Sequence, residues 1–225
     1  MNSKEVIKRL QKMANPKNVE GMARFGISTN NTLGISIPFL RDMVKEIGRD
    51  HKLALELWDS GIHEARMLAC FVDEVDKVTE KQMDEWVAGF DSWDICDQCC
   101  SNLFDRTPFV HKKILQWVKD EREFMRRAGF VLIAAAAVHR KEWQDEDFLK
   151  YFPLMKEYAT DERNYVRKAV NWALRQVGKR NLSLNKKAIE VAKEIKNINS
   201  KSARWIAADA LRELEGDKLV KRLGG

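Results

Sequence analysis

Apolar and polar residues alternate along this chain with the period of about 3.6 residues that is typical of amphipathic helices. Residues that start and stop helices recur throughout, so the pattern divides the chain into many short helices. It predicts helices over residues 50–59, 63–74, 80–90, 93–104, 108–119, 121–140, 146–159, 161–179, 183–197 and 200–214. No stretch shows the strict two-residue alternation of a strand, and the predicted fold class is all-α.

Helix-capping residues define further helix starts. Asn2 followed by Glu5 resembles a capping box, and the pair Asn15-Pro16 favours a second helix. Ser36 precedes a third helix that ends near Gly48, after a loop over residues 27–37. The caps expected for the later helices are Thr79, Ser92 and Ser200.

A degenerate repeat of about 40 residues runs through the second half of the chain. The segment Met125-Arg126-Arg127-Ala128 is echoed 41 positions later by Val166-Arg167-Lys168-Ala169, and Ala173-Leu174-Arg175 is echoed 37 positions later by Ala210-Leu211-Arg212. Two-helix repeats of this length are typical of HEAT-like proteins, in which successive helix pairs stack into a solenoid. We therefore expect residues 1–225 to form a single HEAT-like repeat domain with a concave basic face lined by the second helices. An irregular helical bundle remains the alternative.

Composition narrows the class of protein. Hydrophobic residues make up 44% of the chain and only four prolines occur, which suits a packed helical core. The longest apolar run, Ala128 to Val138, is far shorter than the roughly 20 residues that span a bilayer, so no membrane or secretion signal is expected. The four cysteines, Cys70, Cys96, Cys99 and Cys100, do not form a spaced framework, so we expect them to be reduced in a cytoplasmic protein. No second pair of ligands accompanies them, so no metal is expected.

Charge is distributed unevenly between the two halves of the chain. Residues 1–110 contain 14 Lys and Arg against 18 Asp and Glu, a net charge of −4, whereas residues 111–225 contain 26 against 16, a net charge of +10. A strongly basic second half favours a polyanionic binding partner. A surface that is charged only for solubility would give the same net charge.

The segment that begins at Trp93 is the first candidate for chemistry. A four-residue spacing places Trp93 and Asp97 on one helix face, so an aromatic ring lies beside a carboxylate. Such a carboxylate could stabilise a developing sugar cation next to a ring packed on a nucleoside. The alternative is structural: acids are favoured in the first turns of helices, and Trp93 can belong to the core.

Paired bases near two helix starts are the second candidate. Arg126 and Arg127 lie near the start of a largely apolar helix, and Arg167 and Lys168 occupy the equivalent place one repeat later. A bound phosphate would suit them, because free backbone N–H groups and basic side chains would point at it. The alternative is an ion pair with first-turn acids such as Glu123 or Glu162.

An aromatic and basic stripe follows on the same predicted helix. Trp172 lies four residues after Lys168, and Arg175 follows within the next turn. Such stripes suit nucleic acids, although a core tryptophan flanked by bases would look the same.

Other chemistries find no support in the sequence. The four histidines are scattered, and neither a phosphate-binding P-loop nor a dinucleotide fingerprint occurs. No cofactor is expected.

Taken together, these segments resemble the AlkD-type DNA alkylation-repair glycosylases, a family of HEAT-like repeat DNA glycosylases. The resemblance covers nearly the whole chain and is carried by Met22-Ala23-Arg24-Phe25, Trp93-Asp94-Ile95-Cys96-Asp97, Met125-Arg126-Arg127-Ala128 and Lys168-Ala169-Val170-Asn171-Trp172-Ala173-Leu174-Arg175, in the family's order. It implies a monomeric, monofunctional glycosylase that binds duplex DNA and removes purines alkylated on ring nitrogens without flipping the base.

The resemblance also assigns roles to residues. It implies that Asp97 is the catalytic carboxylate, that Trp93 and Trp172 flank the damaged nucleotide, and that Arg127 holds the DNA backbone. Phe25 stands where the best-known members have tyrosine, at a position that contacts the lesion. Ser92 stands where they carry another tryptophan.

Three hypotheses follow. In the first, the protein is a glycosylase in which Asp97 stabilises the departing sugar while the phosphates are held by Arg126, Arg127, Arg167, Lys168 and Arg175. In the second, it is a non-catalytic binder of damaged or structured DNA, as some members of the family are. In the third, it is a scaffold that binds peptides.

Overall fold

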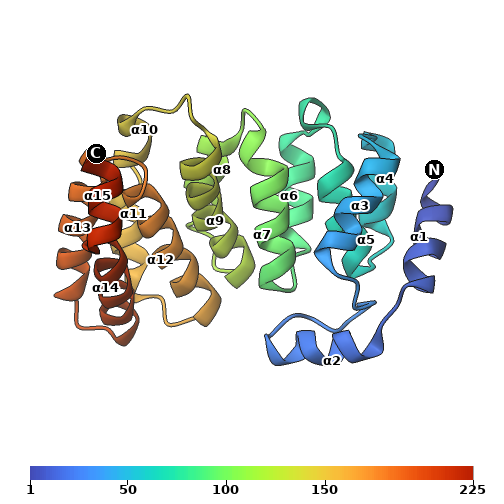
Figure 1. Ribbon diagram of the computed structural model, residues 1–225, viewed down its shortest axis with the longest axis horizontal. Coiled ribbons are helices and arrows are strands. Elements are labelled where there is room, and N and C mark those ends of the chain that lie inside the picture. The colour runs from blue at the N-terminus through green and yellow to red at the C-terminus, as the bar shows by residue number, and fades with distance from the viewer. Residues whose placement is uncertain (225) are drawn as a thin grey trace. The chain divides into compact units, whose positions relative to one another are not determined.

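The computed structural model describes residues 1–224 and divides the chain into two compact units, residues 1–109 and residues 110–225, which are described separately. Helices account for 74% of the residues, and no strand occurs in the described part of the chain (Figure 1). The prediction of an all-α fold is therefore confirmed. No helix within residues 1–224 is long and apolar enough to cross a membrane.

The first unit contains seven α-helices and two short 3-10 helices. They are α1 (Ser3–Lys12), α2 (Pro16–Arg24), α3 (Ile37–Ile47), α4 (His51–Asp59), α5 (His63–Val72), η1 (Val75–Lys77), α6 (Glu80–Ala88), α7 (Trp93–Asn102) and η2 (Phe104–Arg106).

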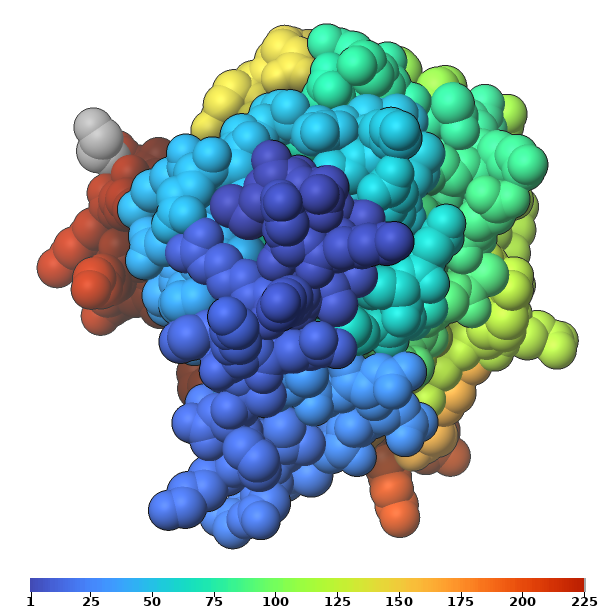
Figure 2. Space-filling view, turned by 90° about the vertical axis from the view of Figure 1, so that its right-hand side faces the viewer, coloured from blue at the N-terminus to red at the C-terminus, as the bar shows by residue number. Residues whose placement is uncertain are grey.

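Helices of the first unit pack as two adjoining rows. Trp58 of α4 stacks on Trp86 of α6 with ring centroids 4.2 Å apart, and α5 packs against α7. Both tryptophans are buried, so this pair forms part of the core of the unit. Helix α1 covers α4 and α5 from outside, where Figure 2 shows it in dark blue. Helix α2 lies crosswise below the ends of its neighbours and has no buried residue (Figure 1).

The second unit contains the remaining helices. They are α8 (Val110–Trp117), α9 (Glu123–His139), α10 (Asp145–Leu149), α11 (Phe152–Glu157), η3 (Tyr158–Thr160), α12 (Asn164–Gly178), α13 (Leu182–Lys196), α14 (Lys201–Leu214) and α15 (Asp217–Gly224).

Helix α9 is the centre of the second unit. Its residues from Ala128 to Ala137 are all buried, which explains why this segment is apolar on every side. Gly129 lets α8 approach closely, because a Cβ at this position would lie only 2.7 Å from Val118 Cγ1. Helix α12 packs on α9 and α14 packs on α12, so the second helices of the predicted repeats are neighbours.

Most predicted helices are confirmed to within a few residues at their ends. The capping box of Asn2 and Glu5 forms, and Thr79 and Ser200 cap their helices, whereas Ser92 makes no cap hydrogen bond. The single helix predicted over 146–159 is wrong. Two short helices replace it, with Pro153 in the first turn of the second, where its missing N–H costs nothing. Helix α15 was not predicted.

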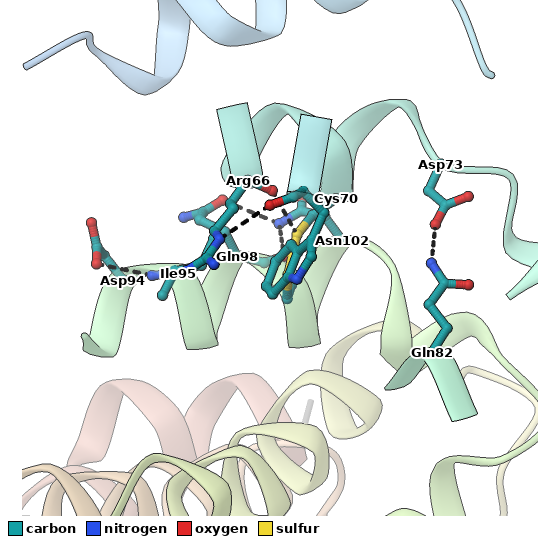
Figure 3. Close-up of a disulfide and its surroundings, with 10 residues drawn as sticks. Arg66, Cys70, Asp73, Gln82, Asp94, Ile95, Gln98 and Asn102 are labelled. Atoms are coloured by element: carbon teal, nitrogen blue, oxygen red, sulfur yellow. Dashed lines mark hydrogen bonds between the residues drawn. A yellow bond between two sulfur atoms is a disulfide. The ribbon is translucent and has the colours of Figure 1, made fainter. Parts of the chain in front are cut away.

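The expectation that all four cysteines are reduced is wrong for Cys70 and Cys99, which form a disulfide between α5 and α7 (Figure 3). Their Cα atoms are 5.2 Å apart although 29 positions separate them, because the two helices pack side by side. Cys96 and Cys100 keep buried thiols, and burial raises the pKa of the Cys100 thiol well above its ordinary value, with a further contribution from Cys96.

Candidate functional site

The first turns of α7 present an aromatic ring and a carboxylate on one face. Trp93 and Asp97 are both partly exposed, as their predicted roles require. The indole Nε1 of Trp93 donates a hydrogen bond of 3.0 Å to the backbone carbonyl of Phe25, just after α2. The Phe25 ring itself is 74% exposed, so it is available to contact a ligand. Trp93 and Phe25 are thus neighbours in space although 68 positions separate them.

A buried acid and imidazole fix the start of α7. Asp94 accepts hydrogen bonds from Ser92 Oγ at 2.6 Å, from the backbone N–H of Ile95 at 2.9 Å and from His63 Nε2 at 2.9 Å. Ser92 is fully buried in this arrangement. Its hydroxyl therefore holds Asp94, at the position where the resembled family carries a tryptophan.

The pair shifts the pKa of both partners. Burial alone lowers the pKa of His63, but the hydrogen bond and charge of Asp94, with smaller contributions from Glu64 and Asp91, outweigh it and raise the pKa overall. Burial alone raises the pKa of Asp94, but the hydrogen bond and charge of His63 and the contacts with Ser92 and Ile95 lower it overall. Each group therefore favours the charged form of the other.

Glu64 holds the loop that carries α2. Its carboxylate, fully buried, accepts hydrogen bonds from the backbone N–H groups of Leu33, Gly34 and Ile35 at 2.7 to 3.2 Å. Gly34 has a positive φ of 78°, and a Cβ there would lie 2.3 Å from the carbonyl oxygen of Asn15. Only glycine fits this position, so the loop and α2 are held in place although α2 has no buried residue.

Helix α12 presents the basic and aromatic residues of the second unit. Lys168 is exposed, and Trp172, one turn later, is half-buried. The guanidinium of Arg167 lies over the ring of Trp205 of α14, 5.2 Å from its centroid, and Trp205 is 38% exposed. The only side-chain hydrogen bond that Arg167 makes within residues 1–224 is to Asn164, at 3.2 Å, so no carboxylate neutralises its guanidinium. This surface suits an anionic partner with aromatic groups.

Two other predicted arginines are held by carboxylates. Arg126 donates to Asp161 at 2.7 Å and to the carbonyl of Val118 at 3.1 Å. Arg175 donates to Asp209 at 2.9 Å and also pairs with Glu213. Arg126 therefore forms an ion pair, the alternative considered for these bases, but its acid is Asp161 and not the expected Glu123 or Glu162. Contacts of Arg126 and Arg175 with DNA phosphates stay predictions.

Arg127 occupies a different environment from the one its predicted role requires. It is only 5% exposed, and its Nη1 donates to the backbone carbonyl of Tyr165 at 2.7 Å. In this conformation it ties the start of α12 to α9. Its contact with the DNA backbone stays a prediction.

Sequence reasoning missed two parts of the site. Trp205 lies 37 positions after Lys168, which is the same offset that relates Arg175 to Arg212, so the repeat could have indicated it. The pair of His63 and Asp94 had no comparable signal, because nothing in the sequence relates residues of α5 to residues of α7. No group of three or more possible metal ligands occurs within residues 1–224.

Comparisons with known proteins concern the family and the fold of the chain. The family profile described as DNA alkylation repair enzyme matches residues 6–214. One solved structure superposes with a TM-score of 0.80 and 19% sequence identity, covering 95% of this chain and 96% of the other. That protein is described as one of a new family of proteins related to the HEAT-like repeat DNA glycosylases with affinity for branched DNA structures. No curated protein sequence matches the chain.

The fold therefore defines an all-α protein of the HEAT-like repeat class, as predicted. Within that class, the chain belongs to the family of DNA alkylation repair enzymes.

Proposed function

We propose that this protein is a monofunctional DNA glycosylase that removes purines alkylated on ring nitrogens from duplex DNA. The observation that carries the proposal is the pairing of partly exposed Trp93 and Asp97 one turn apart on α7, in a member of a DNA alkylation repair family. The protein acts as a monomer in the cytoplasm and needs no cofactor.

The chemistry assigned to Asp97 is electrostatic. A purine alkylated on a ring nitrogen already carries a positive charge, so the bond from C1′ to the base nitrogen breaks with both electrons leaving on the base. The sugar becomes an oxocarbenium-like cation that the Asp97 carboxylate stabilises. Water then adds to C1′ and loses a proton. Because the leaving group is already activated, the damaged base can stay in the duplex until the bond breaks.

The remaining predicted residues hold the DNA. Trp93, Phe25 and Trp172 contact the damaged nucleotide through their rings, and all three have exposed ring surface. Backbone phosphates are bound by Arg126, Arg127, Arg167, Lys168 and Arg175. Arg167 and Lys168 are the best supported of these, since neither forms an ion pair within residues 1–224.

Asp97→Asn tests the proposed catalytic role. The wild type is expected to release alkylated purines from methylated duplex DNA, and the variant is expected to lose at least 100-fold in rate because the charge that stabilises the sugar cation is gone. Chromatography of the released bases measures the rate, and a gel-shift titration checks that duplex affinity stays within about twofold. Base release by the variant at the wild-type rate would remove Asp97 from the mechanism.

A second candidate function is non-catalytic binding of branched or damaged DNA. It is favoured by the likeness to a structure described as having affinity for branched DNA, and by Phe25 and Ser92 at positions where the resembled glycosylases carry tyrosine and tryptophan. Duplex binding by the wild type without release of any base would establish this function instead.

A further inference from the structure

Three arginines of the first unit surround a small cavity, which we call the arginine cavity. Its volume is about 150 Å³. It is lined by residues of α3, of the ends of α5 and α7 and of η2, namely Arg41, Val44, Arg49, Phe71, Asn102 and Arg106. All three arginines are exposed. None of these six residues has a part in the proposed chemistry.

The arginine cavity is separate from the surface that carries Trp93 and Asp97. Trp93 is the first residue of α7 and Asn102 is its last, so about 14 Å of helix lies between them at a rise of about 1.5 Å per residue. Figure 3 shows Asp94 and Asn102 at opposite ends of this helix. A group bound in the arginine cavity is therefore a different group from the nucleotide beside Trp93.

Arg41 keeps its hydrogen-bonding groups available. Its guanidinium lies over the ring of Phe71, 5.6 Å from the centroid, and makes no hydrogen bond within residues 1–224. Asp42, the next residue in the chain, binds Lys45 at 2.7 Å. The contact with the ring thus holds the cation at the cavity, and no carboxylate neutralises it.

Arg49 neutralises the negative end of α5 beside the cavity. Its Nη1 donates to the backbone carbonyls of Phe71 at 2.8 Å and Asp73 at 2.9 Å, where the helix ends. These carbonyl oxygens are therefore occupied and do not repel an anion in the cavity. The Nε and Nη2 groups of Arg49 make no hydrogen bond within residues 1–224 and remain available to a ligand.

We infer that the arginine cavity binds one phosphate group. Arginine suits phosphate because its planar guanidinium can donate two parallel hydrogen bonds to the phosphate oxygens. Sites that take whole small molecules have volumes of roughly 300 to 1,000 Å³, so a cavity of about 150 Å³ suits a single group and not a nucleoside. The three arginines also concentrate positive charge in a part of the chain, residues 1–110, whose net charge is −4.

The phosphate has two possible sources. The inference rests on the proposed function, which makes the DNA backbone the source that this protein meets, so the cavity adds a DNA contact in the acidic half of the chain. Free phosphate in solution offers the same chemistry. The experiment therefore has one arm for each source.

Arg41→Gln is the variant that removes the available cation, and Lys8→Gln is its matched control. Lys8 is an exposed residue of α1 that lies outside the cavity and forms no ion pair within residues 1–224. Both substitutions remove one positive charge from the first unit. Because both side chains are exposed, neither change leaves a buried group unpaired, and circular dichroism checks that both variants are folded.

DNA binding is the first arm. The affinity for a labelled duplex is measured by fluorescence anisotropy over a series of salt concentrations. We expect the slope of the logarithm of affinity against the logarithm of salt concentration to become shallower by about 0.9 in Arg41→Gln, the value for one lost phosphate contact, and to stay at the wild-type value in Lys8→Gln.

Binding of inorganic phosphate is the second arm. The Nε–H resonance of Arg41, assigned by its loss in Arg41→Gln, is followed by NMR while phosphate is added, with chloride at the same ionic strength as the reference. A shift that saturates with phosphate and not with chloride supports the site. If it occurs while both variants keep the wild-type salt slope, the source is free phosphate.

The two arms together decide the assignment. A change of slope in Arg41→Gln alone assigns the cavity to the DNA backbone. If the shift does not saturate, and the slope is unchanged in Arg41→Gln or changes equally in Lys8→Gln, the assignment is overturned. Release of bases from methylated DNA by the wild type is measured in parallel. Phosphate or DNA binding that depends on Arg41, without any base release, would contradict the glycosylase proposal and leave the cavity assignment standing.

Discussion

At the residue scale, the buried pair of His63 and Asp94 decides how the start of α7 is held. The two residues are 4% and 7% exposed, so their interaction is only weakly screened by water. Asp94 adjoins Trp93, and the same carboxylate caps the backbone of Ile95. The charge state of this pair therefore affects the segment that presents the proposed catalytic face.

The pair predicts a dependence of stability on pH. Because the folded-state pKa of His63 is raised, its contribution is complete below an unfolded value of about 6.5 and is lost as pH rises through the folded value. Because the pKa of Asp94 is lowered, its contribution is present above about 3.9 and is lost as pH falls through the folded value. The pair stabilises the fold most between about pH 4 and pH 6.5.

Urea unfolding from pH 6.5 to 8.5 measures this effect. We expect the free energy of unfolding of the wild type to fall over this range, and that of Asp94→Asn to lack this fall, because the variant has no charge that raises the pKa of His63. Parallel pH profiles for the two proteins would contradict the assignment.

Trp205 is a partly exposed aromatic residue that we expect to contact DNA. Its ring lies under the guanidinium of Arg167. Substitution of Trp205 therefore removes a surface for base stacking and also the cation–π contact that holds Arg167. Trp205→Ala is expected to weaken DNA binding by about 1 to 3 kcal/mol, the usual value for a lost aromatic stack. Trp205→Phe should restore most of it. Fluorescence anisotropy with labelled duplex measures both, and equal affinity of wild type and Trp205→Ala would show that α14 does not contact DNA.

At the scale of elements, the packing of α5 on α7 brings together the disulfide, the buried pair and one wall of the arginine cavity. Cys70 and Cys99 join the C-terminal parts of the two helices, and His63 and Asp94 join their first turns. Figure 3 shows the disulfide between the same two helices, with Asp94 and Gln98 on α7. Helix α2, by contrast, is held mainly by hydrogen bonds from its ends and loop, such as that from Asn18 to the Gly34 carbonyl at 2.8 Å.

Reduction of the disulfide should lower stability. A bond that closes a loop of 29 residues restricts the unfolded chain, which in the chain-entropy model contributes about 3 to 4 kcal/mol. We expect the urea midpoint to fall when a phosphine reductant is added. The double variant Cys70→Ala, Cys99→Ala is the control, since it should unfold at the same midpoint with and without reductant. Wild-type protein that is insensitive to the reductant would show that the bond contributes nothing.

At the scale of the whole molecule, charge determines which half of the chain an anionic partner meets. The net charge of +10 over residues 111–225 contrasts with −4 over residues 1–110. Many cations of the basic half are paired internally, as Arg175 is with Asp209 and Glu213, so the formal charge overstates the number of groups available to phosphates. Exposed Lys168 and half-buried Arg167 are the best candidates for such contacts.

The salt dependence of DNA binding tests this view. The logarithm of the affinity should fall linearly with the logarithm of salt concentration, with a slope of about −0.9 for each phosphate contact. Lys168→Ala is expected to make the slope shallower by about 1, whereas Asp97→Asn should leave it unchanged. An unchanged slope in Lys168→Ala would remove this residue from the DNA contacts.

Local rules were enough to predict the helical class, the approximate helix bounds and the repeat. Capping residues and apolar periodicity act within a few positions, so the capping box of Asn2 and the buried length of α9 could be derived without a structure. The break before Pro153 was missed because the apolar pattern continues across it. Helix α15 was missed because its amphipathic pattern covers only a short segment.

The sequence by itself determined an all-α chain of stacked helix pairs with a basic second half, and it identified Trp93 and Asp97 as partners on one helix face. Only the tertiary structure decided which side chains form contacts or bonds with residues distant in the sequence. It buried Arg127 against the Tyr165 carbonyl, and it joined Cys70 to Cys99 across 29 positions. These outcomes depend on how helices far apart in the chain pack together, and the periodicity of a single helix carries no information about its neighbours.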